Sequence, residues 1–295
     1  MAQGAKVFIG ISGWSYKGWR GKFYPKDLPG REQLAYAARC FNSIEINTTF
    51  YGQQRPESFA RWMEATPKGF VFAVKGPRYV THVRRLKDAE TPLANFFASG
   101  VLQLGSKLGA ILWQLPPNFR FEAERLTAFL KLLPRDAEAA RRLALHHEPR
   151  LAGRVWLRRP AHRRLRHALE VRHESFVTPE LVKILRAHGV GLVCADAVAW
   201  PMLMDLTADF VYCRLHGSEE LYASGYDERA LRRWAARIEA WSRGGEPEDA
   251  KRAIDAAGPH RRSRDVFVYF DNDRKVRAPA DARRLMEILG VVPTG

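Results

Sequence analysis

A nine-residue stretch in the middle of the chain, ALEVRHESF at 168–176, passes from an apolar run directly into charged side chains. Within it, Glu170, Arg172 and His173 supply a carboxylate, a guanidinium and an imidazole. Carboxylates and histidines transfer protons in enzymes, and a guanidinium binds carboxylates or phosphates through paired hydrogen bonds. The stretch therefore suggests anion binding and proton transfer, provided that similar residues meet it from elsewhere in the chain.

Polar side chains also stand near the ends of the other apolar runs. They are Glu45, Asn47, Lys75, Gln114, Asp196, Arg214, His216, Asp271 and Asn272. In a barrel of parallel strands, the residues at the C-terminal strand ends surround one mouth, where active sites lie. We expect these side chains to share a pocket there. The alternative is that they are ordinary charges near loops, paired with one another along the rim.

The apolar runs alternate with helical patterns, which is typical of a parallel sheet. We expect strands at 7–12, 43–47, 70–75, 109–115, 167–172, 191–195, 210–215 and 266–270, and helices at about 31–40, 56–65, 91–104, 122–133, 179–188, 228–242 and 279–289. Eight such units over 295 residues predict a single α/β domain, residues 1–295, folded as a somewhat irregular TIM (β/α)8-type barrel. The connection 196–209 is too short for a full helix, so the sixth unit should be short.

Alternate residues along a strand face opposite sides, so the two faces can be separated by counting. In the fifth strand, Leu169 and Val171 share one face, whereas Glu170 and Arg172 share the other. The second, fourth and seventh strands divide in the same way. One face of each strand should pack on helices while the other ends in polar groups within the barrel.

These polar groups can be given roles in a leading hypothesis. Lys75, Arg172 and Arg214 would bind an anion, while Glu45 or Glu170 with His216 would move a proton. The remaining candidate ligand-binding residues are His82 and His173 beside these cations, Trp14, Tyr16 and Trp19 after the first strand, and Thr49 and Tyr51 after the second. The rings would grip the body of a ligand, or alternatively seal the loops against the barrel.

The chain is strongly basic, with 48 Lys and Arg against 32 Asp and Glu and a net charge of +16. Residues 134–167, between the fourth and fifth strands, hold ten Arg against three acidic residues and look like an elaboration of the barrel. They are either an arginine-rich solvated surface or a footprint for nucleic acid. We expect a cytoplasmic protein without a membrane segment, and we expect Cys40, Cys194 and Cys213 to be reduced core thiols.

Few cofactor classes find support in the sequence. The Walker loop, the GxGxxG fingerprint, the GxSxG elbow and the HExxH metal motif are all missing from it. Glu45, Glu170, Asp196 and His216 would suit a divalent metal, but Lys75 and the arginines would oppose a cation placed among them. A metal is possible and not favoured, and the cofactor stays unknown.

Seven short motifs, in a fixed order along the chain, resemble those of a known protein family. They are GISGWSYKGWRGKFYP at 10–25, FNSIEINTTFY at 41–51, KGPRYVTH at 75–82, LWQLPP at 112–117, EVRHESF at 170–176, RLHG at 214–217 and YFDND at 269–273. The chain resembles the YecE-like family, the domain of unknown function 72, over essentially its whole length. The resemblance implies a TIM-like barrel and leaves the activity open. Asp271 stands where the family pattern leads us to expect Asn, and Phe176 where it usually has Trp.

Three functions remain open on the sequence. The first is a barrel enzyme acting on a phosphate- or carboxylate-bearing small molecule at the C-terminal mouth. The second is a nucleic-acid-binding or processing protein that uses the basic segment together with aromatic rings. The third is a scaffold that binds no ligand. The sequence leaves the substrate and the oligomeric state undetermined.

Overall fold

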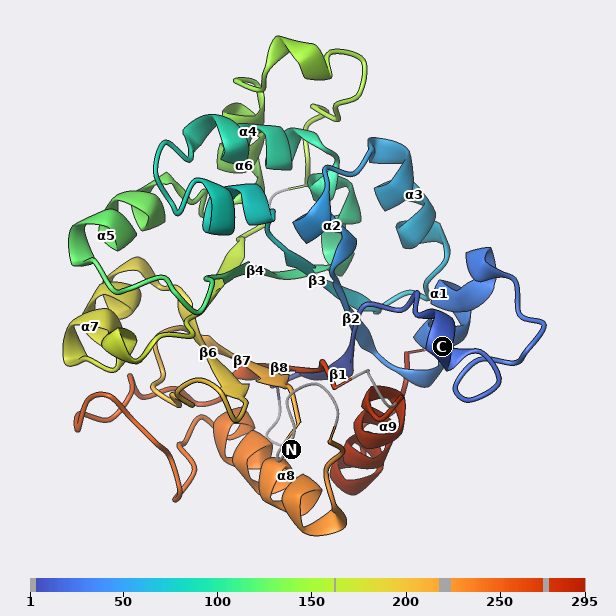
Figure 1. Cartoon of the computed structure of the whole chain (residues 1–295), viewed down its shortest axis with the longest axis vertical. Coiled ribbons are helices and arrows are strands. Elements are labelled where there is room, and N and C mark those ends of the chain that lie inside the picture. The colour runs from blue at the N-terminus through green and yellow to red at the C-terminus, as the bar shows by residue number, and fades with distance from the viewer. Residues whose placement is uncertain (1–3, 162, 218–223, 273–275, 295) are drawn as a thin grey trace.

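Eight apolar segments form parallel strands that close into a barrel in the order β1 to β8 (Figure 1). The computed structural model describes residues 4–161, 163–217, 224–272 and 276–294. The strands are β1 Val7–Ser12, β2 Ser43–Ile46, β3 Val71–Lys75, β4 Leu108–Gln114, β5 Arg166–Glu170, β6 Gly191–Asp196, β7 Phe210–Leu215 and β8 Asp265–Phe270. The predicted TIM-type barrel is confirmed, and each predicted strand lies within two residues of an observed one.

Helices surround the strands in the pattern of a (β/α)8 barrel (Figure 1). They are α1 Gln33–Cys40, α2 Thr48–Tyr51, α3 Pro56–Glu64, α4 Glu90–Ala98, α5 Ala123–Leu132, α6 Ala137–Ala144, α7 Pro179–His188, α8 Glu228–Ser242 and α9 Ala278–Leu289. Pro56 and Pro179 open their helices, where the missing N–H costs no hydrogen bond. The predictions did not include α2, which is a single turn, or α6, which begins after its N-cap Asp136. The predicted short sixth unit agrees with the described connection between β6 and β7, which contains no helix.

The side chains inside the barrel form two layers. The lower layer, nearer the N-terminal ends of the strands, is apolar, and the upper layer, at their C-terminal ends, is polar. In the lower layer, Phe8 and Phe267 stack with their ring centroids 4.8 Å apart, and Phe210 meets Phe267 edge to face. The outward faces of the strands pack on the helices and form the larger hydrophobic cluster. The apolar layer fills the lower barrel, so the polar layer is confined to the C-terminal mouth.

Two features outside the mouth bear on the predictions from sequence. Cys40, Cys194 and Cys213 are free thiols, and the last two are buried, whereas Cys40 is half-buried. Within the described ranges, no helix combines the length and the apolar character needed to cross a membrane.

Candidate functional site at the barrel mouth

One guanidinium joins three acidic side chains in the polar layer. Arg214, on β7, is fully buried. It donates from Nε and Nη2 to the two carboxylate oxygens of Glu45 at 3.1 and 2.9 Å, from Nη1 to Glu170 Oε2 at 2.8 Å, and from Nη2 to Asp271 Oδ2 at 2.7 Å. Despite burial, these acids raise the pKa of Arg214 well above its usual value. The cluster fixes the ends of β2, β5, β7 and β8 around one cation.

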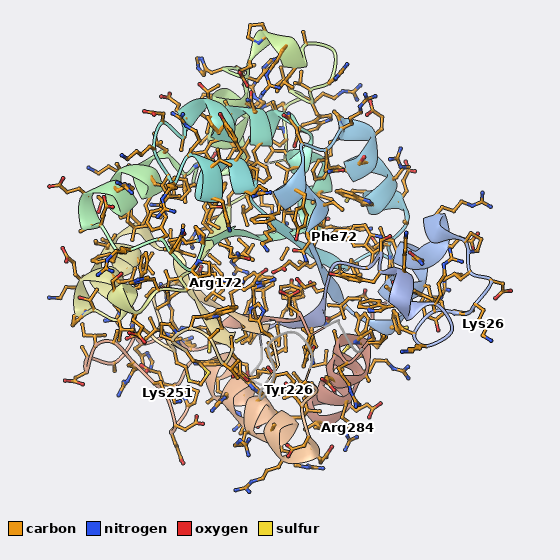
Figure 2. All side chains as sticks on the ribbon, viewed as in Figure 1. Lys26, Phe72, Arg172, Tyr226, Lys251 and Arg284 are labelled. Atoms are coloured by element: carbon orange, nitrogen blue, oxygen red, sulfur yellow. The ribbon has the colours of Figure 1, made fainter. Side chains whose placement is uncertain are left out.

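A second arginine is held on the same network. Arg172 lies inside the ring of strands, whereas Lys26, Lys251 and Arg284 lie at the periphery (Figure 2). It donates from Nε to Glu170 Oε1 at 2.6 Å, and its guanidinium carbon lies 4.1 Å from the centroid of the Trp200 ring. Burial alone would raise the pKa of Glu170, but Arg172 and Arg214 hold it well below its usual range. Glu170 is therefore ionised, and its oxygens are already engaged.

His216 and Asp271 form a buried pair beside Arg214. The Nδ1 atom of His216 lies 3.2 Å from Asp271 Oδ2, and the Trp200 ring packs edge-on against the imidazole. Burial and the Arg214 charge lower the pKa of His216, which favours the neutral imidazole. Burial would raise the pKa of Asp271, yet Arg214 and then His216 hold it well below its usual range.

The floor under this network is also hydrogen-bonded. Tyr212 donates to Glu45 Oε2 at 2.6 Å, and the hydroxyl of Ser12 donates to Glu45 Oε1. Ser12 in turn accepts from Arg214 Nη2 at 3.0 Å and from Asn47 Nδ2 at 2.9 Å. Ser12, Tyr212 and Trp200 were not predicted. Counting alternate residues would have placed Ser12 and Tyr212 inside the barrel, but nothing in the sequence marks the loop residue Trp200.

In the described part of the chain, the polar layer on the side of β2, β3 and β4 contains side-chain groups without hydrogen-bond partners. Among the described residues, no hydrogen bond or ion pair engages the side chains of Lys75 and Gln114, and Asn47 Oδ1 is buried without a hydrogen-bond partner. Ile46 pairs with Val74, so Asn47 and Lys75 follow at the same level, and Gln114 ends the next strand. The three polar groups therefore form an arc along adjacent strands, facing the saturated network around Arg214.

Lys75 is the cation of this arc. Its side chain is 6% exposed, and Nζ lies 4.2 Å from the centroid of the Phe50 ring. Burial, and then repulsion by Arg214, lower its pKa to about 8. Thr49 donates to the Lys75 carbonyl at 2.6 Å, which fixes α2 against the end of β3.

His82, which follows β3 in a π-helical turn at Tyr79–Val83, lies beside Lys75. Its ring meets Phe50 edge to face at 5.0 Å, and Nδ1 is 2.9 Å from the Thr81 hydroxyl. Burial and then the Lys75 charge lower the pKa of His82 to about 4. The imidazole is therefore neutral at pH 7 and can accept a proton at the mouth.

The structure directs three of the candidate residues away from the mouth. Trp19 is 1% exposed and packs on Tyr16 and Phe23, with ring centroids 4.7 and 5.5 Å apart, so it seals the loop. Asp196 shares the outward face of β6 and accepts from Trp234 Nε1 on α8 at 3.1 Å. Asn272 faces α9, where its Nδ2 donates to Asp281 at 2.8 Å.

Four further candidates have mainly structural contacts. Trp14 meets Trp62 edge to face at 5.6 Å, and Tyr16 donates to the Ser12 carbonyl at 2.6 Å. His173 caps the turn at Glu174–Phe176 by accepting from the Ser175 N–H. Tyr51 is 74% exposed and packs edge-on against Phe50.

The arrangement offers little to a metal ion. In the ranges that the structure describes, no group of three or more His, Cys, Asp or Glu side chains is placed to hold one. Of the four residues considered as a metal set, Glu45 and Glu170 bind Arg214, and Asp196 points away from the mouth.

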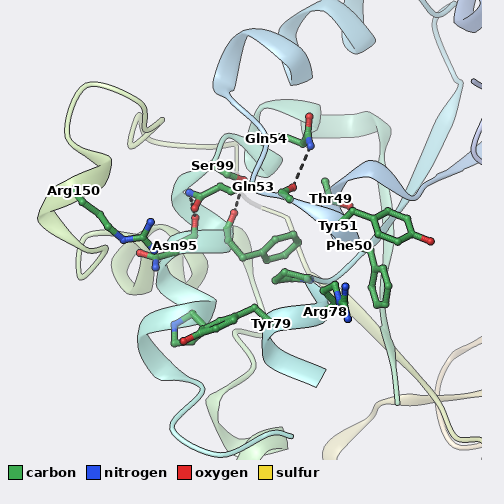
Figure 3. A pocket seen from close by; sticks show the side chains of 14 residues that line it. Thr49, Phe50, Tyr51, Gln53, Gln54, Arg78, Tyr79, Asn95, Ser99 and Arg150 are labelled. Atoms are coloured by element: carbon green, nitrogen blue, oxygen red, sulfur yellow. Dashed lines mark hydrogen bonds between the residues drawn. The ribbon is translucent and has the colours of Figure 1, made fainter. Parts of the chain in front are cut away.

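A mainly apolar pocket of about 240 Å³ is lined by residues of α2, of the segment after β3 and of α4 (Figure 3). Its lining includes Phe50, Tyr51, Tyr79, Phe96 and the rim residue Arg150. None of the acids bound to Arg214 lines it, so it is separate from the network. Phe50 belongs to both places, since it lines the pocket and also lies under the Lys75 ammonium.

The family model described as "Protein of unknown function DUF72" matches residues 8–294. The chain belongs to this family. The UPF0759 protein YecE of Escherichia coli is 33% identical over 129 residues, which cover 43% of this chain and 44% of YecE. This chain therefore spans less than half the length of the curated relatives that it matches.

Solved DUF72 structures share the barrel over nearly the whole chain. A DUF72 family protein from Thermotoga maritima has a TM-score of 0.72 at 27% identity, covering 97% of this chain and 99% of that one. Another from Enterococcus faecalis has a TM-score of 0.68 at 18% identity, covering 96% and 95%. The second likeness concerns the fold alone.

The basic segment of this DUF72 protein is largely occupied by contacts within the chain. Seven of its ten arginines have acceptors or acidic partners, namely Arg135, Arg141, Arg142, Arg150, Arg163, Arg164 and Arg166. Arg163 donates to the Ser106 carbonyl at 3.0 Å, and Arg166 pairs with Asp265 at 2.7 Å. Four of the seven therefore tie the segment to the rest of the barrel, and the other three pair with acids of the segment itself.

Proposed function

We propose that this DUF72 protein is an enzyme that binds an anionic, carboxylate- or phosphate-bearing small molecule at the barrel mouth. The observation that carries the proposal is the open arc formed by Asn47, Lys75 and Gln114. Polar groups in a folded interior are nearly always hydrogen-bonded, because an unmade bond costs about 1–3 kcal/mol. A ligand in the mouth would supply the partners that the described protein groups do not.

The charges indicate which ligand group would meet which side chain. Arg214 is engaged by three acids, and Arg172 is engaged by Glu170. Lys75 is the mouth cation without a described acidic partner within ion-pair distance, so its ammonium would receive the anion. The amides of Asn47 and Gln114 would bind hydroxyl or carbonyl groups on the same molecule.

The geometry favours His82 as the group that moves a proton. Glu45 and Glu170 are the acids suggested by sequence, but their oxygens accept from Arg214, Tyr212 and Arg172, so a proton would compete with these bonds. His82 is half-buried, is held neutral, and lies on the Lys75 side of the mouth. A neutral imidazole can act as a general base, and the lowered pKa of His82 makes it a weak one until a bound anion offsets the Lys75 charge.

Calorimetry tests the binding half of this proposal. Inorganic phosphate and lactate would be titrated into the wild-type protein and into the Lys75→Met, Lys75→Arg and Lys131→Met variants. We expect saturable binding of at least one anion, abolished in Lys75→Met and retained in Lys75→Arg and in the exposed control Lys131→Met. Equal affinity in wild type and Lys75→Met would contradict the assignment of Lys75.

The proposal that the protein is an enzyme is tested by measuring turnover, once an anion is found to bind. Turnover of small phosphorylated and carboxylated compounds that compete with that anion would be compared in wild type and His82→Gln. We expect turnover of a competing compound, reduced at least about 100-fold in His82→Gln, in line with the loss of a general base. Unchanged turnover in His82→Gln would remove His82 from the proposal.

The nucleic-acid alternative has less support in the structure. Its footprint would depend on the arginines of 134–167 without a described side-chain hydrogen bond or ion pair, which are Arg154, Arg158 and Arg159. An oligonucleotide affinity that falls steeply with salt and is lost when these three are replaced would favour that alternative instead.

A further inference from the structure

We propose that Lys75 is a carbonyl-reactive lysine, whose amine forms an imine with an aldehyde or ketone carbon of the anionic molecule at the mouth. This inference rests on the proposed function and narrows its substrate class to anionic carbonyl compounds. It is carried by a contrast between two buried lysines of this chain.

Lys75 and Lys107 have similarly small exposed fractions but differ in their partners. Lys107 is 8% exposed, and its ammonium donates to the Met63 carbonyl, the Thr66 carbonyl and the Thr66 hydroxyl at 2.7, 2.6 and 2.9 Å. Lys75 is 6% exposed and donates to no acceptor among the described residues. Lys107 therefore uses all three donors in a structural tie, whereas the nitrogen of Lys75 is available for reaction.

The surroundings of Lys75 suit an amine nucleophile. A lysine becomes nucleophilic when it is desolvated or placed beside another cation, because both conditions favour the neutral amine. Lys75 meets both, since it is 6% exposed and repelled by Arg214, and its pKa falls to about 8. Glu170 and Asp271 stay ionised nearby and would stabilise the positive charge of a protonated imine.

The backbone under Lys75 is fixed. The N–H of Gly76 donates to the Leu112 carbonyl at 2.8 Å, and Thr49 donates to the Lys75 carbonyl at 2.6 Å. A Cβ atom added at Gly76 would lie 2.4 Å from the Trp113 ring, so the chain packs tightly directly after the lysine. The amine is thus presented from a rigid strand end, as precise covalent chemistry requires.

The chemical step balances without an oxidant or reductant. The Lys75 ammonium that attracts the anion first releases a proton to solvent. The neutral amine then attacks the carbonyl carbon, a C–N bond forms, and one nitrogen proton passes to the carbonyl oxygen to give a carbinolamine. The hydroxyl then takes up a proton from solvent, the C–O bond breaks, and the hydroxyl leaves as water, which yields the protonated imine. His82 is the neutral imidazole on this side of the mouth that would carry these protons.

Reductive trapping tests the proposal with matched probes. The protein would be incubated near pH 8 with pyruvate or dihydroxyacetone phosphate and sodium cyanoborohydride, followed by peptide mass spectrometry. Lactate and glycerol phosphate are the controls, because they carry the same anions without a carbonyl group. We expect the reduced adduct at Lys75 at least about ten-fold above that at surface lysines, since ordinary lysines with pKa values of about 10.4 have a smaller neutral fraction. Lys107 should also stay unmodified, because its nitrogen is held by three acceptors although burial lowers its pKa.

The variants separate the two proposals. Lys75→Arg keeps the cation but cannot form an imine, so it should bind lactate or glycerol phosphate and lose the adduct. Binding of these anions without trapping at Lys75 in wild type would overturn the imine and leave the proposed function standing. Absence of both binding and trapping would contradict the two together, and a melting temperature within a few degrees of wild type would show that Lys75→Arg is folded.

Discussion

Arg214 meets Glu45 side-on, with Nε 3.1 Å from Oε2 and Nη2 2.9 Å from Oε1 of the same carboxylate. Both side chains are fully buried, and the same guanidinium also binds Glu170 and Asp271. The polar layer of the barrel is therefore built around one arginine, whose partners are all engaged. The open arc of Asn47, Lys75 and Gln114 differs because it contains polar groups without described hydrogen-bond partners. The first prediction concerns this arginine.

Replacing Arg214 should strongly destabilise the fold. Arg214→Met leaves three buried carboxylates without their shared cation, and breaking a buried ion pair typically costs about 3–5 kcal/mol. Urea denaturation followed by circular dichroism would measure the change in free energy of unfolding. Arg284→Met is the matched control, because Arg284 also binds acids but is exposed, where water and salt screen such pairs and they contribute little to stability. Similar stability losses in the two variants would contradict the central role of Arg214.

Asp271→Asn should change how stability depends on acid. The pKa of Asp271 is lowered in the folded state, so below the ordinary range near about 4 the unfolded chain binds the proton more tightly. The stability that this carboxylate contributes is therefore present at neutral pH and lost as the pH falls. We expect the advantage of wild type over Asp271→Asn, measured by denaturant midpoints, to shrink progressively below pH of about 4. A constant difference across that range would show that Asp271 is not held ionised.

Lys75→Met should change how stability depends on alkaline pH. The pKa of Lys75 is about 8 in the folded chain and about 10.4 when unfolded, so between these values the unfolded state holds more protons. The free energy of unfolding of wild type should therefore rise relative to Lys75→Met across this window, by a total of about 3 kcal/mol. Denaturation at pH 7, 8, 9 and 10 would measure the difference. A flat difference would mean that the lysine has an ordinary pKa.

Gly76→Ala should destabilise the protein and distort the barrel mouth, although it replaces no charged residue. The new Cβ would lie 2.4 Å from two atoms of the Trp113 ring, so the strand end or the ring must move. We expect a loss of about 1–3 kcal/mol, as for an overpacked core, together with weaker binding of any mouth ligand. Gly52→Ala is the control, because an added Cβ there meets nothing within 4 Å and its φ of −161° suits any residue. Equal stabilities of the two variants would contradict the tight packing under Lys75.

The sequence predicts the barrel well because periodicity and register reinforce each other. Alternation placed Glu45, Glu170 and Arg214 inside the barrel. Because the outward face of each strand packs on helices, the inner face is where these polar side chains lie. The same counting applied to Asp196 and Asn272 would have directed them outward, since Asp196 shares its face with Cys194 and Asn272 shares its face with Phe270. For these two residues, counting alternate positions predicts the direction of the side chain better than position near a strand end does.

Other features depend on contacts that no local pattern contains. Trp19 is buried by Tyr16, Phe23 and Tyr24, whose convergence arises from the folded loop. The availability of Lys75 also depends on its neighbours, since the equally buried Lys107 binds three acceptors. The sequence identified the residue types at the mouth, but only the structure separated the saturated groups from the open ones.

The most direct test of anion binding at Lys75 is an NMR titration of protein labelled with ¹³C at the lysine side chains. The Lys75 signal would be assigned by its absence in Lys75→Arg, and lactate or inorganic phosphate would be added at pH 7. We expect a saturable shift of the Lys75 signal while the Lys107 signal stays in place. A Lys75 signal that does not move, or that moves no more than those of exposed lysines, would contradict anion binding at the barrel mouth.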